Sequence, residues 1–117
     1  MKTVFLFLLA SCAMTFAQPK GEVYVVTHVD VNGPNAVPTS NKLLLDYVAE
    51  SRKDKGAVRI EVVVQDGRPN HYTLVEVWQS REAFEAHTAT DYAKHFREKL
   101  QPFLGSPFDE RLHSVLQ

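Results

Sequence analysis

The sequence contains little cysteine, little glycine and almost no net charge. Of its 117 residues one is cysteine and five are glycine, and the formal net charge is −1. These numbers exclude a disulfide scaffold, a collagen-like repeat and wholesale disorder, because 44% of the residues are hydrophobic. No basic stripe interleaved with aromatic residues is present, which argues against a nucleic-acid-binding module. The length and composition predict one globular domain.

Several motifs for cofactor chemistry are also missing. The sequence has no HExxH, no GxGxxG, no GxxxxGK[ST] and no nucleophile elbow. His87 and His95 fall in separate predicted helices, so they lack the spacing of paired metal ligands. We therefore expect no metal and no nucleotide or flavin cofactor.

The first 17 residues are typical of a secretory signal peptide. Met1-Lys2-Thr3 is a short basic start, Val4–Ala10 is an unbroken apolar run, and Thr15-Phe16-Ala17 offers a small-x-small cleavage site. The apolar run is shorter than the about 20 residues that a membrane span needs. We expect export to the periplasm or the medium without a membrane span. The alternative is a lipoprotein signal, in which Cys12 carries a lipid anchor.

The remaining chain alternates between strand and helix patterns. Expected strands cover 23–31, 57–65, 71–78 and 108–116, and expected helices start after caps at Ser40, Ser80 and Thr90. Lys53 and Lys55 are assigned to the last turn of the first helix, which Gly56 ends. The order β-α-β-β-α-α-β predicts an α+β, ferredoxin-like split βαβ domain over residues 22–117, with one antiparallel sheet.

Both faces of the expected sheet carry apolar residues. On the second strand Val58, Ile60, Val62 and Val64 should share one side. The face that the helices cannot cover holds further valines, namely Val63, Val75, Val77 and Val115. An exposed apolar patch of that size predicts a homodimer that stacks sheet on sheet. Charged residues on the outer strands are expected to pair across strands: Arg59, Glu61, Asp109 and Arg111.

The third strand and the helix after it carry the candidate site. Tyr72, Leu74, Glu76 and Trp78 share one face by the period of two, and His87 lies two turns into the following helix. An indole, a carboxylate and an imidazole around an apolar space suit a planar phenolic ligand. We predict that Trp78 and His87 border one open space. His87 is then the candidate catalytic base and Glu76 the catalytic group that orients it, while Trp78 stacks on the substrate.

Each of these side chains also has a purely structural interpretation. Trp78 is equally consistent with a residue that fills the core. Glu76 can serve only to cap the helix that begins after Ser80. His87 can be a hydrogen-bonded core histidine that ties a helix to the sheet.

Residues 71–96, HYTLVEVWQSREAFEAHTATDYAKHF, resemble the antibiotic biosynthesis monooxygenase (ABM) domain family. The resemblance rests on the Glu76-x-Trp78 strand end, the Ser80 cap, Phe84, His87 and the following helix. It implies a ferredoxin-like subunit of a dimeric α/β barrel, with a pocket between sheet and helices. The residues that it suggests for binding a substrate are Trp78, Tyr72, Leu74, Phe84, Tyr92 and Phe96. Quinone-forming members of the family carry asparagine where this chain has Leu74.

The resemblance implies cofactor-independent oxidation of a quinol-like or polyphenolic aromatic by dioxygen, in an exported homodimer. Two alternatives stay open. One is a non-catalytic module that binds a small aromatic or lipid-like ligand. The other is a relative that binds or degrades haem, with His87 as the axial ligand.

Overall fold

The computed structural model describes residues 21–117. The predicted signal peptide, its cleavage after Ala17 and the alternative anchor at Cys12 lie outside these residues. The helices and strands follow one another in the predicted order, and their bounds are β1 Val23–Asp30, η1 Pro34–Ala36, α1 Val37–Ser51, β2 Ala57–Gln65, β3 Arg68–Trp78, α2 Arg81–Thr88, α3 Asp91–Leu100, η2 Gln101–Phe103 and β4 Asp109–Ser114. The predicted α+β ferredoxin-like fold is confirmed.

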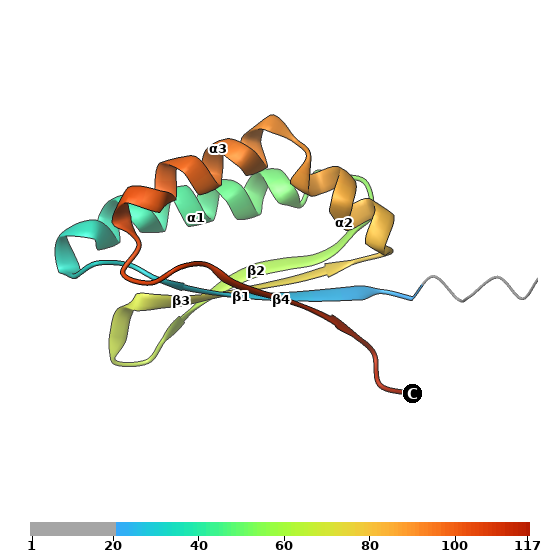
Figure 1. The fold of residues 1–117 in the computed structure, drawn as a ribbon, viewed down its shortest axis with the longest axis horizontal. Coiled ribbons are helices and arrows are strands. Elements are labelled where there is room, and N and C mark those ends of the chain that lie inside the picture. The colour runs from blue at the N-terminus through green and yellow to red at the C-terminus, as the bar shows by residue number, and fades with distance from the viewer. Residues whose placement is uncertain (1–20) are drawn as a thin grey trace, which may run out of the picture.

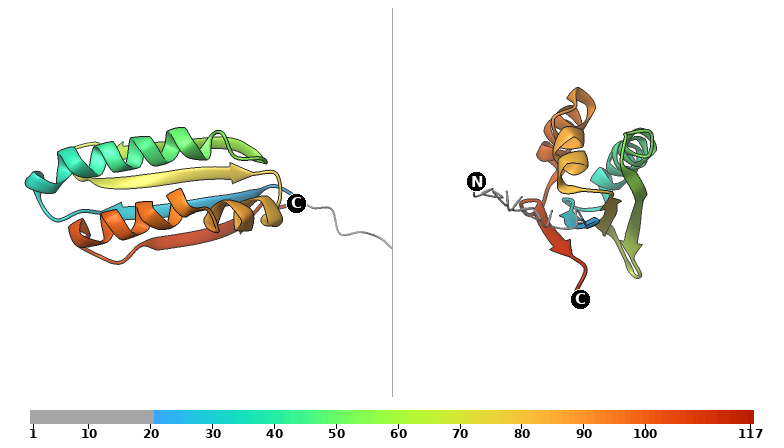
Figure 2. Two further views of the ribbon diagram at one scale, coloured as in Figure 1. Left: turned by 90° about the horizontal axis from the view of Figure 1, so that it is seen from above. Right: turned by 90° about the vertical axis from the view of Figure 1, so that its right-hand side faces the viewer.

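The strands form one antiparallel sheet in the order β2-β3-β1-β4. All three α-helices lie on the same face of this sheet (Figure 1). Seen from above, α1 and α3 run side by side, α1 over the β2 side and α3 over the β4 side (Figure 2). The opposite face is covered by no helix of the described chain.

The core lies between the sheet and the helices. Val25 and Val29 of β1, Leu74 of β3, Leu44 of α1 and Leu100 of α3 are all buried there. Alternate residues of β1 point into this layer, which follows from the period of two in a strand. The hairpin between β2 and β3 turns at Asp66 and Gly67, where Gly67 has φ of 77°.

The first helix differs from its prediction at both ends. It begins at Val37, directly after η1, and Ser40 is a buried residue inside it rather than its cap. Proline near the start of each segment fixes a helical φ before Ser40 is reached. The helix ends at Ser51, so Lys53 and Lys55 lie in the turns that follow, not in its last turn.

Two predictions about β2 and the charged residues are wrong as well. The register shift between Ala57 and Arg59 takes Val58 out of the alternation, and Val58 is exposed. From Ile60 to Val64 the register is regular, so Ile60, Val62 and Val64 share one side as predicted, although only Ile60 is fully buried there and Val64 is exposed. The charged residues pair along single strands: Arg59 with Glu61, and Arg111 with Asp109. Cross-strand pairing among them is impossible because β2 and β4 are opposite edges of the sheet.

Candidate functional site

The end of β3 brings an indole and a carboxylate under the helices. Tyr72, Leu74, Glu76 and Trp78 are all buried on the helix side of the sheet, as their alternation predicts. Trp78 is 0% exposed and Glu76 1% exposed. A buried carboxylate is costly unless it has partners, so its surroundings decide its role.

The helix α2 places His87 directly on Trp78. Ser80 caps α2 by accepting a hydrogen bond from the Ala83 amide, as predicted, and His87 lies in its last turn. The imidazole and indole stack with 4.4 Å between ring centroids and 29° between planes. The predicted open space between these two rings is therefore absent, because their flat faces bury most area in direct contact.

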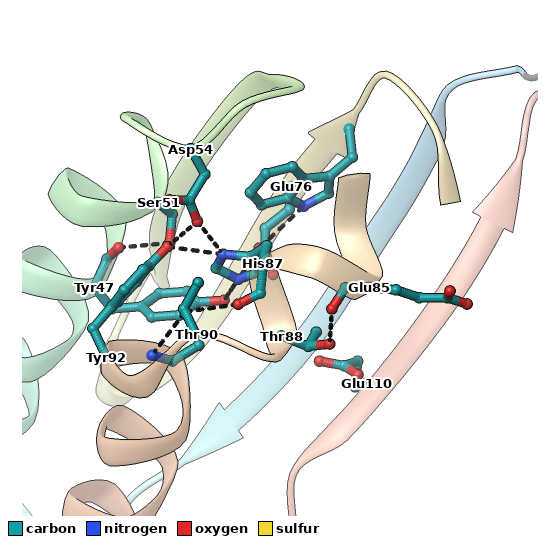
Figure 3. A network of polar contacts seen from close by, with 12 residues as sticks. Tyr47, Ser51, Asp54, Glu76, Glu85, His87, Thr88, Thr90, Tyr92 and Glu110 are labelled. Carbon is teal, nitrogen blue, oxygen red and sulfur yellow. Dashed lines mark hydrogen bonds and ion pairs between the residues drawn. The ribbon is translucent and has the colours of Figure 1, made fainter. Parts of the chain in front are cut away.

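Both ring nitrogens of His87 are hydrogen-bonded (Figure 3). Nδ1 lies 2.8 Å from Asp54 Oδ2 and 2.8 Å from the Tyr92 hydroxyl, and Nε2 lies 2.7 Å from the Tyr47 hydroxyl. The Tyr92 hydroxyl also donates a short hydrogen bond to Asp54 Oδ2. A carboxylate only accepts, so Nδ1 carries the proton and Nε2 is the basic nitrogen that faces Tyr47.

Glu76 completes this chain on the sheet side. Its Oε1 lies 3.2 Å from the Tyr47 hydroxyl, 3.3 Å from the Trp78 indole nitrogen and 3.6 Å from His87 Nε2. Burial raises the pKa of Glu76 to about 7, although the hydrogen bonds from Tyr47 and Trp78 oppose the rise. The alternative role of Glu76 as a cap of α2 is excluded, since Ser80 performs it.

The chain of contacts from Asp54 through His87 and Tyr47 to Glu76 is called the acid–base network below. Burial lowers the pKa of His87, and the hydrogen bond that its Nδ1–H donates to the Asp54 carboxylate partly offsets this. Burial also raises the pKa of Tyr47. The low-dielectric surroundings thus favour the neutral forms of Glu76 and His87. The one hydroxyl proton of Tyr47 is donated to Glu76 Oε1 when that carboxyl is ionised, and it is free to be donated to His87 Nε2 when Glu76 is protonated and itself donates to Tyr47.

The acid–base network reaches a groove between α1 and α3. This groove has a volume of about 200 Å³ and is lined by Leu43, Asp46, Tyr47, Glu50, Tyr92, His95, Phe96 and Lys99. Tyr47 and Tyr92 belong to both the groove and the network. Asp54, whose side chain is 24% exposed, is the other point at which the network meets solvent.

The sequence model of the antibiotic biosynthesis monooxygenase family matches residues 23–99, more than half of the chain. The protein belongs to this family. Solved structures agree with the assignment at the level of the fold. A putative antibiotic biosynthesis monooxygenase from Nitrosomonas europaea superposes with a TM-score of 0.77 at 15% identity, over 86% of this chain and 95% of the other.

A variant of SnoaB, a cofactor-independent oxygenase from Streptomyces nogalater, superposes with a TM-score of 0.72 at 20% identity, over 82% of this chain and 94% of that one. An uncharacterized protein of Synechocystis is 24% identical over 71 residues. That alignment covers 61% of this chain and 48% of the relative, so the chain spans about half the length of that relative.

The residues suggested for substrate binding separate into four places in this ABM domain. Tyr92 and Phe96 line the groove, and Phe96 stacks on Tyr47 at 4.2 Å between centroids. Phe84 packs near Trp78, with 6.4 Å between ring centroids. Leu74 is buried in the core, and Tyr72 lines a different groove of about 170 Å³ between α1 and β2.

Three members of the site were not recognised as functional from the sequence: Tyr47, Ser51 and Asp54. Tyr47 and Ser51 follow helical spacing on the buried side of α1, a pattern that indicates core packing and nothing more. Asp54 lies in the turn after α1, where acidic residues are common. Only the fold brings this turn within hydrogen-bond distance of α2.

Among residues 21–117, no three His, Cys, Asp or Glu side chains group in a way that fits a metal ion. No helix in that range is both long and apolar enough to cross a membrane. His87 does not fit the role of a haem ligand, since both of its nitrogens are occupied and its side chain is 1% exposed.

Proposed function

We propose that the protein is a cofactor-independent monooxygenase that oxidises a quinol-like or polyphenolic aromatic with dioxygen. The observation that carries the proposal is that two tyrosines of the α1–α3 groove, Tyr47 and Tyr92, are hydrogen-bonded to the buried His87. A groove with aromatic walls thus adjoins a base that a carboxylate orients. Perturbed acid–base groups beside a cleft are typical of catalytic sites.

The proposed reaction balances without a cofactor. One quinol with a ring C–H and one dioxygen yield one hydroxyquinone and one water. The quinol loses a proton, and its anion gives electrons to dioxygen as a bond forms between a ring carbon and oxygen. The O–O bond of the resulting hydroperoxide then breaks with loss of water, so one oxygen atom remains on the ring. All four electrons come from the substrate.

The acid–base network supplies the proton acceptor that this reaction needs. As the substrate hydroxyl gives its proton to the Tyr47 oxygen, Tyr47 passes its own proton to His87 Nε2 across 2.7 Å. Asp54 pairs with the resulting imidazolium at Nδ1, and the stacked indole of Trp78 stabilises it by a cation–π interaction. Glu76, with a pKa of about 7, can return a proton when the hydroperoxide loses water.

The groove sets the size of the ring that enters. Phe96, Tyr47 and Tyr92 provide aromatic walls, and Leu43 adds an aliphatic one. Its volume of about 200 Å³ accommodates one aromatic ring, since cavities of about 150 Å³ in other proteins bind benzene. Further rings of a polyphenol would extend toward the open side of the groove.

The test is oxygen uptake by the purified protein with naphthohydroquinone, after subtraction of the uncatalysed autoxidation. Labelled dioxygen should place one labelled atom in the product and one in water. His87→Asn should lower the rate by at least 10²-fold, the usual contribution of a general base. His71→Asn is the matched control, because His71 pairs with Asp30 far from the groove. Equal rates for both variants would rule out His87 as the base.

A second candidate function is favoured by the Trp78–His87 stack and the buried Leu74. The indole and imidazole pack face to face, so no substrate can lie between them, and Leu74 is buried in the core. The domain therefore also fits a non-catalytic module that binds an aromatic ligand in the groove. It predicts saturable quenching of Trp78 fluorescence by a hydroquinone without oxygen uptake. Trp78 is the only tryptophan, so the signal has one source.

We also propose that the protein forms a homodimer and that it is exported from the cell. The helix-free face of the sheet exposes Val63 and Val115, and a second subunit stacked there would form the dimeric α/β barrel. Light scattering of the purified domain measures the stoichiometry. N-terminal sequencing of protein from the producing cell distinguishes cleavage after Ala17 from retention at Cys12.

A further inference from the structure

The four tyrosines of the chain have very different hydrogen-bond partners. Tyr47 faces the basic Nε2 of His87 at 2.7 Å, and Tyr92 donates to the Asp54 carboxylate. Tyr72 donates to the Asn41 side-chain oxygen at 2.6 Å. Tyr24 lies on the helix-free face of the sheet, where it lines a shallow hollow with His113. Tyr92 also lies 2.8 Å from His87, but at Nδ1, the nitrogen that carries the ring proton, so among these tyrosines only Tyr47 faces the basic nitrogen.

The hydrogen bond between the Tyr47 hydroxyl and His87 Nε2 favours one-electron oxidation of the Tyr47 ring. Removing an electron makes the phenolic proton strongly acidic, and a buried ring cannot remain a cation at low dielectric. A base at hydrogen-bond distance takes the proton in the same step and leaves a neutral radical. An imidazole is a better acceptor than a carboxylate, whose ordinary pKa is about 2.6 units lower, or an amide oxygen.

The surroundings of His87 stabilise the product of this step. The imidazolium would face Asp54 at Nδ1 and the indole of Trp78 across 4.4 Å. On the other side, Glu76 Oε1 remains 3.2 Å from the Tyr47 oxygen, where a protonated carboxyl can donate to the radical. Phe96 stacks on the Tyr47 ring at 4.2 Å and shields it from solvent.

We propose that Tyr47 is a redox-active tyrosine that forms a neutral radical with its proton held on His87. The oxidant is a peroxyl or hydroperoxyl radical, which takes one electron from Tyr47 at the groove and one proton from solvent to become a hydroperoxide. The phenolic O–H bond breaks and an N–H bond forms at Nε2.

The geometry distinguishes Tyr47 from the other oxidisable rings. Trp78 is fully buried and does not line the groove, so it has no direct contact with an oxidant there. Tyr92 lines the groove, but its hydroxyl donates to the Asp54 carboxylate and meets His87 only at the proton-bearing Nδ1, so no free nitrogen base is at hand to take its proton. The proposal does not depend on the monooxygenase activity, because an external oxidant in the absence of substrate is sufficient to test it.

The experiment uses the purified full chain without any quinol. A photo-oxidised ruthenium tris-bipyridine complex with persulfate withdraws one electron, and electron paramagnetic resonance identifies the radical. The wild type should give a neutral tyrosyl signal, and Tyr47→Phe should lose it. Tyr72→Phe, a buried phenol without a base, should retain the wild-type signal.

Two further variants guard against loss of the fold. A triple variant, with Tyr24→Phe, Tyr72→Phe and Tyr92→Phe, keeps Tyr47 as the sole tyrosine and should still give the signal. His87→Asn retains Tyr47 but removes its base, and should abolish the long-lived signal while circular dichroism remains native. A signal that follows Tyr92 or an indole signal from Trp78 would overturn the proposal, as would an unchanged signal in His87→Asn.

Discussion

The two faces of the sheet differ in which of their side chains are unusual for their surroundings. The helix-covered face buries polar groups, among them Thr27, Glu76 and His87. The helix-free face exposes valines, and Val63 retains 48% of its surface. Proteins normally bury valine and expose glutamate.

Polar groups buried within the core and valines exposed on the opposite face are both unfavourable for an isolated subunit unless each has a partner. Burying Glu76 and His87 costs free energy unless they are paired, and here every buried polar atom of the acid–base network has a partner. Within residues 21–117 the one buried side-chain oxygen without a partner is that of Ser40, outside the network. The covered face therefore carries the site for which acid–base chemistry is proposed, and the helix-free face carries the surface that is proposed to meet a second subunit.

The largest expected difference between the faces is in packing. Trp78→Ala should lower the free energy of unfolding by about 3–5 kcal/mol, because it leaves a cavity beneath His87. Val63→Ala on the other face should change it by less than about 0.5 kcal/mol. Urea unfolding of both variants, monitored by circular dichroism, makes the comparison. Similar losses would mean that the two faces are equally packed.

The pH dependence of stability should distinguish Glu76 from other carboxylates. Its folded pKa of about 7 exceeds the unfolded value, so its contribution is fully present below about pH 4.3 and is lost as the pH rises through 7. The difference amounts to about 3 kcal/mol. Unfolding free energies measured from pH 4 to 8 should therefore fall more steeply in the wild type than in Glu76→Gln.

His87 affects the pH dependence of stability in the opposite direction to Glu76, and comparing the wild type with Glu76→Gln removes this second effect. Its pKa is lowered in the fold, so its contribution is lost as the pH falls below that of a free histidine. Both proteins retain this effect, and it cancels in the difference. Parallel pH profiles would contradict a buried, protonated Glu76.

Removing the charge of Asp54 should have a smaller effect on stability than Trp78→Ala. Asp54→Asn should lower the pKa of His87 further, because the carboxylate is what partly offsets burial. It should also cost about 1–3 kcal/mol of stability, since a buried hydrogen bond to a charged acceptor is weakened. Titration of the histidine ring signals by nuclear magnetic resonance gives the pKa. Asp109→Asn, an exposed carboxylate paired with Arg111, is the control and should leave His87 unchanged.

A charged substitution on the helix-free face should leave the fold of the subunit intact but disrupt the proposed contact between two subunits. Val63→Asp should leave the fold and its unfolding free energy nearly unchanged, yet shift the protein from dimer to monomer in light scattering. Leu45→Asp is the matched control, because Leu45 is 61% exposed on α1, on the helix side. Dimers in both variants would exclude the sheet face as the interface.

Local signals in the sequence predict much of this fold. The caps Ser80 and Thr90 are confirmed, because a hydroxyl at these positions satisfies a free helix amide. The Asp66-Gly67 turn predicts the hairpin, and the alternation on β3 predicts that Glu76 and Trp78 point inward. The start of α1 was harder to predict, since prolines and a 3-10 turn replaced the usual side-chain cap.

The sequence by itself determined the order of strands and helices, the inward face of β3 and the presence of His87 beside it. These depend on neighbours within a few positions along the chain, where spacing and residue type are sufficient. Only the tertiary structure decided that His87 stacks on Trp78 and that Asp54 and Tyr47 hold its two nitrogens. These partners lie 33 and 40 positions away along the chain, and their meeting depends on how α1 and α2 pack on one sheet.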